Sequence, residues 1–354
     1  MNLKDCDLDK LRLFVESIGE KPYRAQQLFK WLYGKGVFSF DEMSDLSKAL
    51  REKLRSSASI RPLKLISLHK SKQDDSKKFL FELADGNRIE TVLMFDDRRT
   101  TLCVSTQVGC AIDCKFCATA LMGLQRHLSS GEIVDQFLSV QKAAEVRISN
   151  VVFMGMGEPF HNYENVIKAS RILSDACGPN LARRHLVIST SGVVPKIMRF
   201  ADEGHGYRLA ISLNATTNEV RSRLMPLNKK WPIGELLNAA RYYIQKTKQQ
   251  VTFEYVLMAG INDSLEDAHR LKTLLSDIFC KVNLIPYNAT VKNFRRPGQN
   301  NIEQFFAAMS SLKAPVTIRW SKGEDIAAAC GQLATSEAVA NPAAEGRRNK
   351  KTMT

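Results

Sequence analysis

The spacing of apolar residues changes twice along the chain. Near the N-terminus apolar residues recur every three or four positions and stop before Gly19, which predicts an amphipathic helix. These residues are Leu8, Leu11, Phe14 and Ile18. Stretches 24–33 and 45–54 carry similar stripes, so residues 1–58 are predicted to form a small helical domain. Its Lys30, Trp31 and Tyr33 could contact RNA, or its charges could simply form a solvated face.

From Pro62 the pattern changes to short strand-like runs separated by turn residues. These runs are 63–68, 79–83 and 89–95. Residues 59–100 are therefore predicted to form a β-rich connector between the helical domain and the rest of the chain.

From residue 101 strand-length and helix-length segments alternate. The predicted strands are 101–107, 150–154, 186–190, 208–213, 251–258 and 281–286. The helices between them include 129–145, which Ser129 and Glu132 begin with a capping box, and 164–175, 231–246 and 265–277. Six such βα units predict an α/β domain over 101–335 with a parallel sheet and a binding site beyond the C-terminal ends of its strands.

Charge and composition indicate which kind of molecule the protein binds. The 354 residues include 51 Lys and Arg against 37 Asp and Glu, a net charge of +14 that suits a polyanion such as nucleic acid. Residues 336–354 predict a disordered basic tail that could hold phosphates non-specifically. Its cations are Arg347, Arg348, Lys350 and Lys351. No apolar run approaches 18 residues and no secretory leader is evident, so we expect a cytoplasmic protein without a membrane partner.

Three of the eight cysteines are packed as C-x3-C-x2-C: Cys110, Cys114 and Cys117. Three thiolates can hold three irons of a [4Fe-4S] cubane and leave the fourth iron open to a substrate or cofactor. A zinc site completed by His127 is the alternative, although closed zinc sites usually combine two ligand pairs.

This loop, with Phe116 before its last cysteine, resembles the signature of the radical S-adenosylmethionine (SAM) enzymes. Residues 154–159, Met-Gly-Met-Gly-Glu-Pro, resemble the GGEP-type motif of the same enzymes. Its Gly157 would let the backbone approach SAM closely, and its Glu158 would accept hydrogen bonds from the SAM ammonium group.

The resemblance becomes specific with Cys103 and the segment 323–333, which contains Ala-Cys-Gly-Gln-Leu around Cys330. Together with Tyr-Arg-Ala at 23–25, these features resemble the RNA adenine C2 methyltransferases of the radical SAM superfamily over all but the extreme termini. The resemblance implies a partial (β/α)6 radical SAM barrel with a helical N-terminal domain. It also implies a [4Fe-4S] cluster, two SAM per turnover, an electron-donor protein and a monomeric enzyme.

The implied substrates are an adenine in the peptidyl-transferase region of 23S ribosomal RNA (rRNA) and, in many members, the adenine beside the tRNA anticodon. Adenine C2 is electron-poor, so it cannot attack a SAM methyl group directly. By resemblance, Cys330 takes a methyl from one SAM, and a radical generated from a second SAM activates that methyl for addition to C2. A Cys103–Cys330 disulfide would then release the product.

Further roles carry over from the family to single positions. Glu90 matches the proposed proton acceptor. The matching SAM contacts are Gly157, Glu158, Ser189, Ser212, Leu213, Asn214 and Asn288. The family usually has His where this chain has Asn214, so the resemblance implies hydrogen bonding to SAM at this position and puts proton transfer there in doubt.

Two alternatives stay open on sequence alone. The sibling enzymes that methylate adenine C8 and confer antibiotic resistance share the cluster, the cysteine pair and the fold. A non-enzymatic zinc protein that binds RNA would account for the charge and the clustered cysteines, but it would give no reason for Cys103, Glu158 and Cys330.

Overall fold

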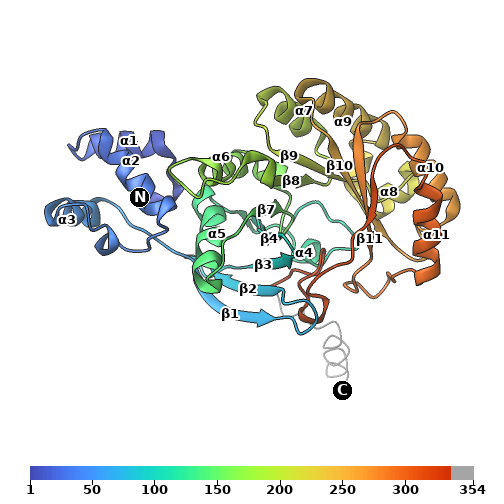
Figure 1. The fold of residues 1–354 in the computed structure, drawn as a ribbon, viewed down its shortest axis with the longest axis horizontal. Helices are drawn as coiled ribbons and strands as arrows, with labels where there is room; N and C mark the ends of the chain where they lie inside the picture. Colours follow the sequence, from blue (N-terminus) through green and yellow to red (C-terminus); the bar gives the residue numbers. More distant parts are fainter. Residues whose placement is uncertain (336–354) are drawn as a thin grey trace, which may run out of the picture.

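The structure, a computed structural model, describes residues 1–335, and the predicted basic tail 336–354 lies outside the described residues. Within them, a helical unit at one end adjoins a larger body in which helices wrap a single curved sheet (Figure 1). None of the helices described is long and apolar enough to cross a membrane.

The N-terminal unit contains short helices: η1 (Leu3–Asp5), α1 (Leu8–Ser17), α2 (Tyr23–Phe29), η2 (Lys30–Gly34), η3 (Phe40–Glu42) and α3 (Lys48–Ser57). Helix α3 starts later than the predicted residue 45, because the Ser47 side chain caps it by accepting a hydrogen bond from the Leu50 N–H. Trp31 and Tyr33 are buried in the core, so the structure contradicts their suggested role as RNA contacts.

One sheet of ten strands runs through the rest of the molecule. In spatial order the strands are β1 (Lys64–Lys70), β2 (Lys77–Glu82), β3 (Arg88–Asp96), β4 (Arg99–Cys103), β7 (Asn150–Phe153), β8 (Leu186–Thr190), β9 (Arg208–Ser212), β10 (Val251–Leu257), β11 (Cys280–Pro286) and β12 (Val316–Ile318). Strands β1 to β4 pair antiparallel, and β4 to β12 pair parallel. The predicted connector therefore extends the barrel sheet.

Helices that follow the parallel strands cover their outer face: α5 (Ser130–Ala144), α6 (Tyr163–Ser174), α7 (Val194–Glu203), α9 (Ile233–Thr247), α10 (Leu265–Leu275) and α11 (Gln299–Met309). Two short helices lie instead at the C-terminal ends of the strands: α4 (Ala118–Leu121) and α8 (Asn218–Leu224). This order confirms the partial (β/α)6 barrel. The capping box that begins α5 is also confirmed, since both Ser129 and Glu132 make its hydrogen bonds. Strand β12 was not predicted, because it has three residues and is only half-buried.

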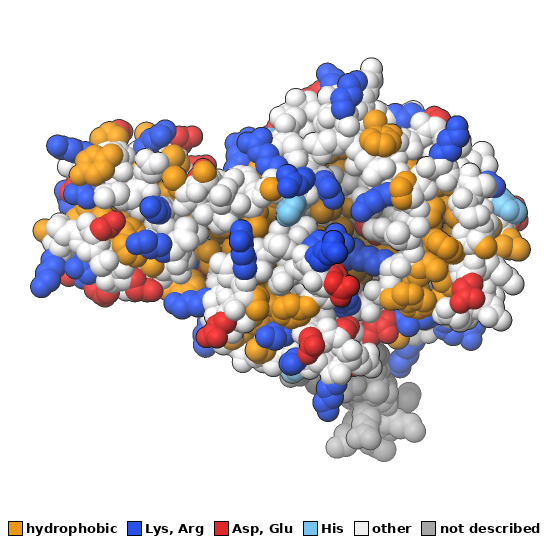
Figure 2. Space-filling view, in the orientation of Figure 1, with side chains coloured by type: hydrophobic (Ala, Val, Ile, Leu, Met, Phe, Trp, Pro, Cys, Tyr) orange, Lys and Arg blue, Asp and Glu red, His pale blue; other side chains and the backbone are white. Residues whose placement is uncertain are grey.

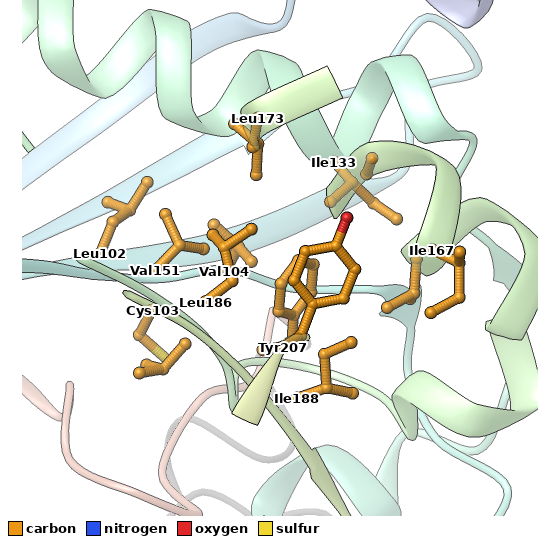
Figure 3. Close-up of a cluster of buried hydrophobic side chains, with 14 of the residues drawn as sticks. Leu102, Cys103, Val104, Ile133, Val151, Ile167, Leu173, Leu186, Ile188 and Tyr207 are labelled. Carbon is orange, nitrogen blue, oxygen red and sulfur yellow. The ribbon is translucent and has the colours of Figure 1, made fainter. Parts of the chain in front are cut away.

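Apolar side chains from the outer face of the sheet form the core with α5 and α6. Figure 3 shows Leu102 of β4 packed beside Val151 and Leu186, with Ile133 and Ile167 contributed by the helices. Side chains alternate along a strand, so the neighbouring Cys103 points to the inner face. The barrel interior therefore receives chemistry-bearing residues from strands whose other face is core.

The predicted strand 101–107 is only partly correct. Strand β4 ends at Cys103, and the chain then leaves the sheet before β5 (Gln107–Val108), which pairs with β6 (Arg126–His127). The N–H groups of Thr106 and Gln107 both donate to the Met156 carbonyl, at 2.8 and 3.2 Å. This departure carries the chain to the cysteine loop.

Candidate active site

The three clustered cysteines lie in the loop between β5 and α4 and line one cavity at the top of the barrel. Gly109 starts this loop at φ 76°, and a Cβ at this position would lie 1.7 Å from the Gly123 carbonyl oxygen. Only glycine can therefore occupy position 109 without moving the backbone. The Cys110 N–H donates to that same carbonyl at 3.1 Å, which closes the loop.

The donor set fits an iron–sulfur cluster, because thiolates are its usual ligands and three of them share this cavity wall. His127 does not line the cavity, and its Nδ1 lies 2.9 Å from Gln107 Nε2. Within residues 1–335 no three His, Cys, Asp or Glu side chains gather closely enough to hold a single metal ion. The Cys3His zinc site considered from the sequence is therefore not formed.

Gly157 and Glu158, in the turn after β7, line the same cavity. Gly157 has φ 103°, and a Cβ there would meet the Gln107 side chain at 2.6 Å. The Glu158 carboxylate is buried, and one of its oxygens accepts hydrogen bonds from both the N–H and the hydroxyl of Ser191, at 2.7 and 2.6 Å. Ser191 was not predicted, and it fixes the orientation of a carboxylate that retains further acceptor capacity.

Of the other predicted SAM contacts, Ser189, Ser212, Asn214 and Asn288 line the same cavity, whereas Leu213 does not. The Leu213 side chain is fully buried in the core. Asn214 has φ 57°, a left-handed conformation that Asn tolerates better than most residues. Its Oδ1 accepts a hydrogen bond from the Val256 N–H at 2.9 Å, so one side of the amide is already committed.

Arg221 of α8 is a buried residue that sequence reasoning missed. Its guanidinium donates to the carbonyls of Ser191 at 2.7 Å, Ser212 at 3.1 Å and Leu213 at 3.0 Å, and so ties the loops after β8 and β9 together. Burial lowers the pKa of Arg221 to about 10. In the sequence it resembles the exposed arginines of any amphipathic helix, so no signal could have distinguished it.

Cys103 and Cys330 meet in a second cavity, which occupies the barrel interior below the first. Cys330 lines both cavities and is exposed to them, whereas Cys103 is buried and lines only the lower one. Both are free thiols. Burial and the neighbouring Cys330 raise the pKa of Cys103 to about 12.

The segment that carries Cys330 is held by hydrogen bonds on two sides. On the cysteine-loop side, the Ala118 N–H donates to the Gly331 carbonyl at 2.8 Å, and the Thr119 hydroxyl donates to the Leu333 carbonyl at 2.6 Å. On the other side, the Ser71 hydroxyl, in the turn between β1 and β2, donates to Asp325 at 2.7 Å. The predicted connector thus helps to position the thiol.

Glu90 lies on β3 and lines neither cavity. It is buried, with one oxygen 2.9 Å from Lys78 Nζ and the other accepting from the Ala334 N–H at 2.9 Å. Burial raises the pKa of Glu90, although Lys78 opposes the shift. The Glu90 carboxylate therefore does not face solvent, and it lies against the segment just after Cys330.

Comparisons with known proteins agree with this geometry. Residues 1–60 match the ribosomal RNA large subunit methyltransferase N-terminal domain, and residues 104–271 match the radical SAM superfamily. A probable dual-specificity RNA methyltransferase RlmN from Geobacillus thermodenitrificans is 51% identical over 93% of this chain and 92% of its own length. The protein of the same name from Bacillus subtilis is 46% identical over 94% of this chain and 92% of its own length.

The crystal structure of a radical SAM methyltransferase from Sphaerobacter thermophilus superposes with a TM-score of 0.90. It is 44% identical to this chain, and the match covers 94% of this chain and 99% of that one. The similarity therefore spans the helical unit, the extended sheet and both cavities. This chain belongs to the RlmN family of radical SAM RNA methyltransferases.

Proposed function

We propose that this enzyme methylates C2 of an adenine in the peptidyl-transferase region of 23S rRNA and of the adenine beside the anticodon in some tRNAs, in the cytoplasm. The names of its relatives, dual-specificity RNA methyltransferases, support two kinds of RNA substrate, and the match of residues 1–60 to a ribosomal RNA large subunit methyltransferase domain supports rRNA as one of them. The observation that carries the proposal is that Cys330 lines both cavities while Cys103 lines the lower one. A methyl group on Cys330 would thus have the SAM site above it and an RNA base below it.

Cys110, Cys114 and Cys117 would hold a [4Fe-4S] cluster, which when bound supplies the electron that cleaves SAM. SAM itself would bind along the upper cavity, where Glu158 would accept hydrogen bonds from its ammonium group. The remaining contacts would come from Gly157, Ser189, Ser212, Asn214 and Asn288, whereas Leu213 lies outside this cavity. One SAM would supply the methyl group and a second the radical, with electrons from a donor protein and the enzyme acting as a monomer.

The two thiols beside the lower cavity would have different roles. Cys330 would lose its proton and accept the methyl group, whose carbon would then become bonded to C2. Cys103 would lose its proton and attack the Cys330 sulfur, which breaks the sulfur–carbon bond; the released carbon would take up a proton to become the methyl group of the product, and a Cys103–Cys330 disulfide would remain. Glu90 would accept the proton from C2. Because Glu90 lines neither cavity and bonds to Ala334, this last role requires residues near 334 to move.

Nucleoside analysis of rRNA and tRNA from a deletion strain tests the proposal. We expect 2-methyladenosine to be absent and to return when the gene is restored, with 2-methyladenosine and 8-methyladenosine standards separating C2 from C8. Restoration with Cys330→Ala should fail, whereas Cys177→Ala, which changes a cysteine outside both cavities, should succeed. Return of 8-methyladenosine alone would contradict the C2 proposal.

A further inference from the structure

Glu254 of β10 carries a buried carboxylate oxygen without a partner. The side chain is 6% exposed, and its Oε1 accepts a hydrogen bond from Asn283 Nδ2 at 2.9 Å. Within residues 1–335 its Oε2 has no hydrogen-bond partner. Leaving a buried polar atom unpaired costs free energy, and burial correspondingly raises the pKa of Glu254. A ligand that brings a hydrogen-bond donor would remove this cost.

The position of Glu254 indicates which ligand that is. Among the residues described, five line both cavities: Met154, Glu254, Ile285, Arg319 and Cys330. Glu158, Ser189 and Asn288 line only the upper cavity, where SAM is proposed to bind. Glu254 therefore lies at the level of Cys330, where the methyl carbon must meet its acceptor, and below the proposed SAM contacts.

Arg319 supplies a donor at the same level. It follows β12, and its backbone N–H donates to the Leu284 carbonyl at 2.8 Å. Its guanidinium makes no hydrogen bond or ion pair to any part of the chain that the structure describes, although Glu254, Cys103 and Cys330 are all close enough to interact with its charge. The boundary between the cavities thus carries one free acceptor and one set of free donors.

Adenine presents the complementary groups. Its Watson–Crick edge carries a donor, the N6 amine, beside an acceptor, N1, and C2 is the next ring atom. Guanine has an oxygen at position 6 and a proton on N1, so both interactions would be reversed. Met154 and Ile285 provide apolar surface for the faces of the ring.

We propose that Glu254 accepts a hydrogen bond from the N6 amine of the target adenine and that Arg319 donates one to N1, so that this pair selects adenine and presents C2 to Cys330. The inference rests on the proposed function and adds to it the residues that determine base specificity. Both residues would touch the substrate, and neither is required to bind the cluster.

The test compares RNA stem-loops that differ only at the target nucleoside: adenosine, purine riboside without the amine, or 1-deazaadenosine without N1. Fluorescence anisotropy gives their affinities without any need for turnover. A hydrogen bond to a charged group contributes about 1.5–3 kcal/mol, so wild-type protein should prefer adenosine by about tenfold or more. Glu254→Ala should remove the preference over purine riboside, and Arg319→Met the preference over 1-deazaadenosine.

Cys177→Ala is the control, since Cys177 lies outside both cavities and should leave both preferences unchanged. Glu254→Gln, which keeps an acceptor of the same shape, should retain part of the preference for the amine and guards against a folding defect. Unchanged preferences in Glu254→Ala and Arg319→Met would overturn the inference. If Glu254→Ala lost affinity for SAM but kept the RNA preferences, the inference would also be overturned, and the carboxylate would be a SAM contact.

Failure of the proposed function would look different. Reconstituted wild-type enzyme would then methylate no adenosine stem-loop at all, and the inference would fall with the proposed function. If the wild type methylated the adenosine stem-loop but Glu254 and Arg319 had no effect on base preference, only the inference would be contradicted, and the proposed function would stand.

Discussion

The amide of Asn288, in the loop after β11, donates a hydrogen bond to the backbone carbonyl of Cys330 at 3.0 Å. Asn288 Oδ1 in turn accepts from Arg296 Nη2 at 3.2 Å, so the amide is fixed from both ends. A residue assigned to SAM binding by resemblance thus also holds the thiol that is proposed to take the methyl group. Changes at position 288 should affect the thiol and the SAM site together.

Asn288→Ala should therefore slow methylation of Cys330 by about tenfold or more while lowering the free energy of unfolding by only about 1 kcal/mol, the typical net contribution of one hydrogen bond. Mass measurement of the Cys330 peptide after incubation with SAM gives the rate, and urea denaturation gives the stability. Asn301→Ala, on the exposed face of α11, is the control and should change neither. An unchanged methylation rate in Asn288→Ala would show that the contact does not position the thiol.

Anaerobic reconstitution should give one [4Fe-4S] cluster per chain, and replacing any of Cys110, Cys114 or Cys117 with Ala should abolish it, because three thiolates are the fewest that leave one iron open. Iron and sulfide analysis provides the measurement. Cys177→Ala should keep the full iron content, since Cys177 lies outside the cavity. Stoichiometric zinc without sulfide in anaerobically purified protein would contradict a radical mechanism.

Variants that lack one of the two thiols of the lower cavity should lose activity at different steps. Cys330→Ala should lose both protein methylation and RNA methylation, because the carbon then has no route to the base. Cys103→Ala should accumulate RNA joined covalently to Cys330, because no second thiol can form the releasing disulfide. Digestion and mass measurement distinguish the two. Normal turnover by Cys103→Ala would rule out the thiol relay.

The helical unit is joined to the barrel by a buried ion pair between Lys4 and Asp135 of α5, whose side chains are both 1% exposed. Lys4→Met should cost about 3–5 kcal/mol of unfolding free energy, because it leaves the Asp135 carboxylate buried without a cation. Adding Asp135→Asn should recover part of this loss, since Asn keeps the acceptor for the Leu63 N–H. Lys10→Met, on the exposed side of α1, is the control in the same urea titration.

Affinity for RNA should fall as salt rises, with a linear dependence of log K on log salt concentration, because phosphate contacts release counterions. Lys and Arg side chains are spread over the face drawn in Figure 2, several of them around a hollow near its middle, in keeping with the net charge of +14. Anisotropy at a series of KCl concentrations measures the slope. If affinity for RNA did not change with salt concentration, the excess Lys and Arg side chains would lie away from the RNA.

The sequence by itself determined the order of helices and strands, because apolar periodicity and capping are local properties of the chain. The capping box at Ser129 and the strand Leu186–Thr190 are direct examples. The cysteine loop and Gly157–Glu158 were also evident, because their chemistry depends on residue types at short spacing. Short or half-buried elements were not, since β12 and the break after Cys103 are fixed by partners elsewhere in the chain.

Only the tertiary structure decided which distant residues share a cavity. It places Ser191 on Glu158 and leaves one oxygen of Glu254 unpaired in the barrel interior. It also buries Arg221 beneath the loops after β8 and β9. These relationships depend on how a curved sheet directs alternate side chains inward from strands far apart in sequence. Local sequence patterns can predict that a side chain faces the barrel interior, but they cannot predict which side chains it contacts there.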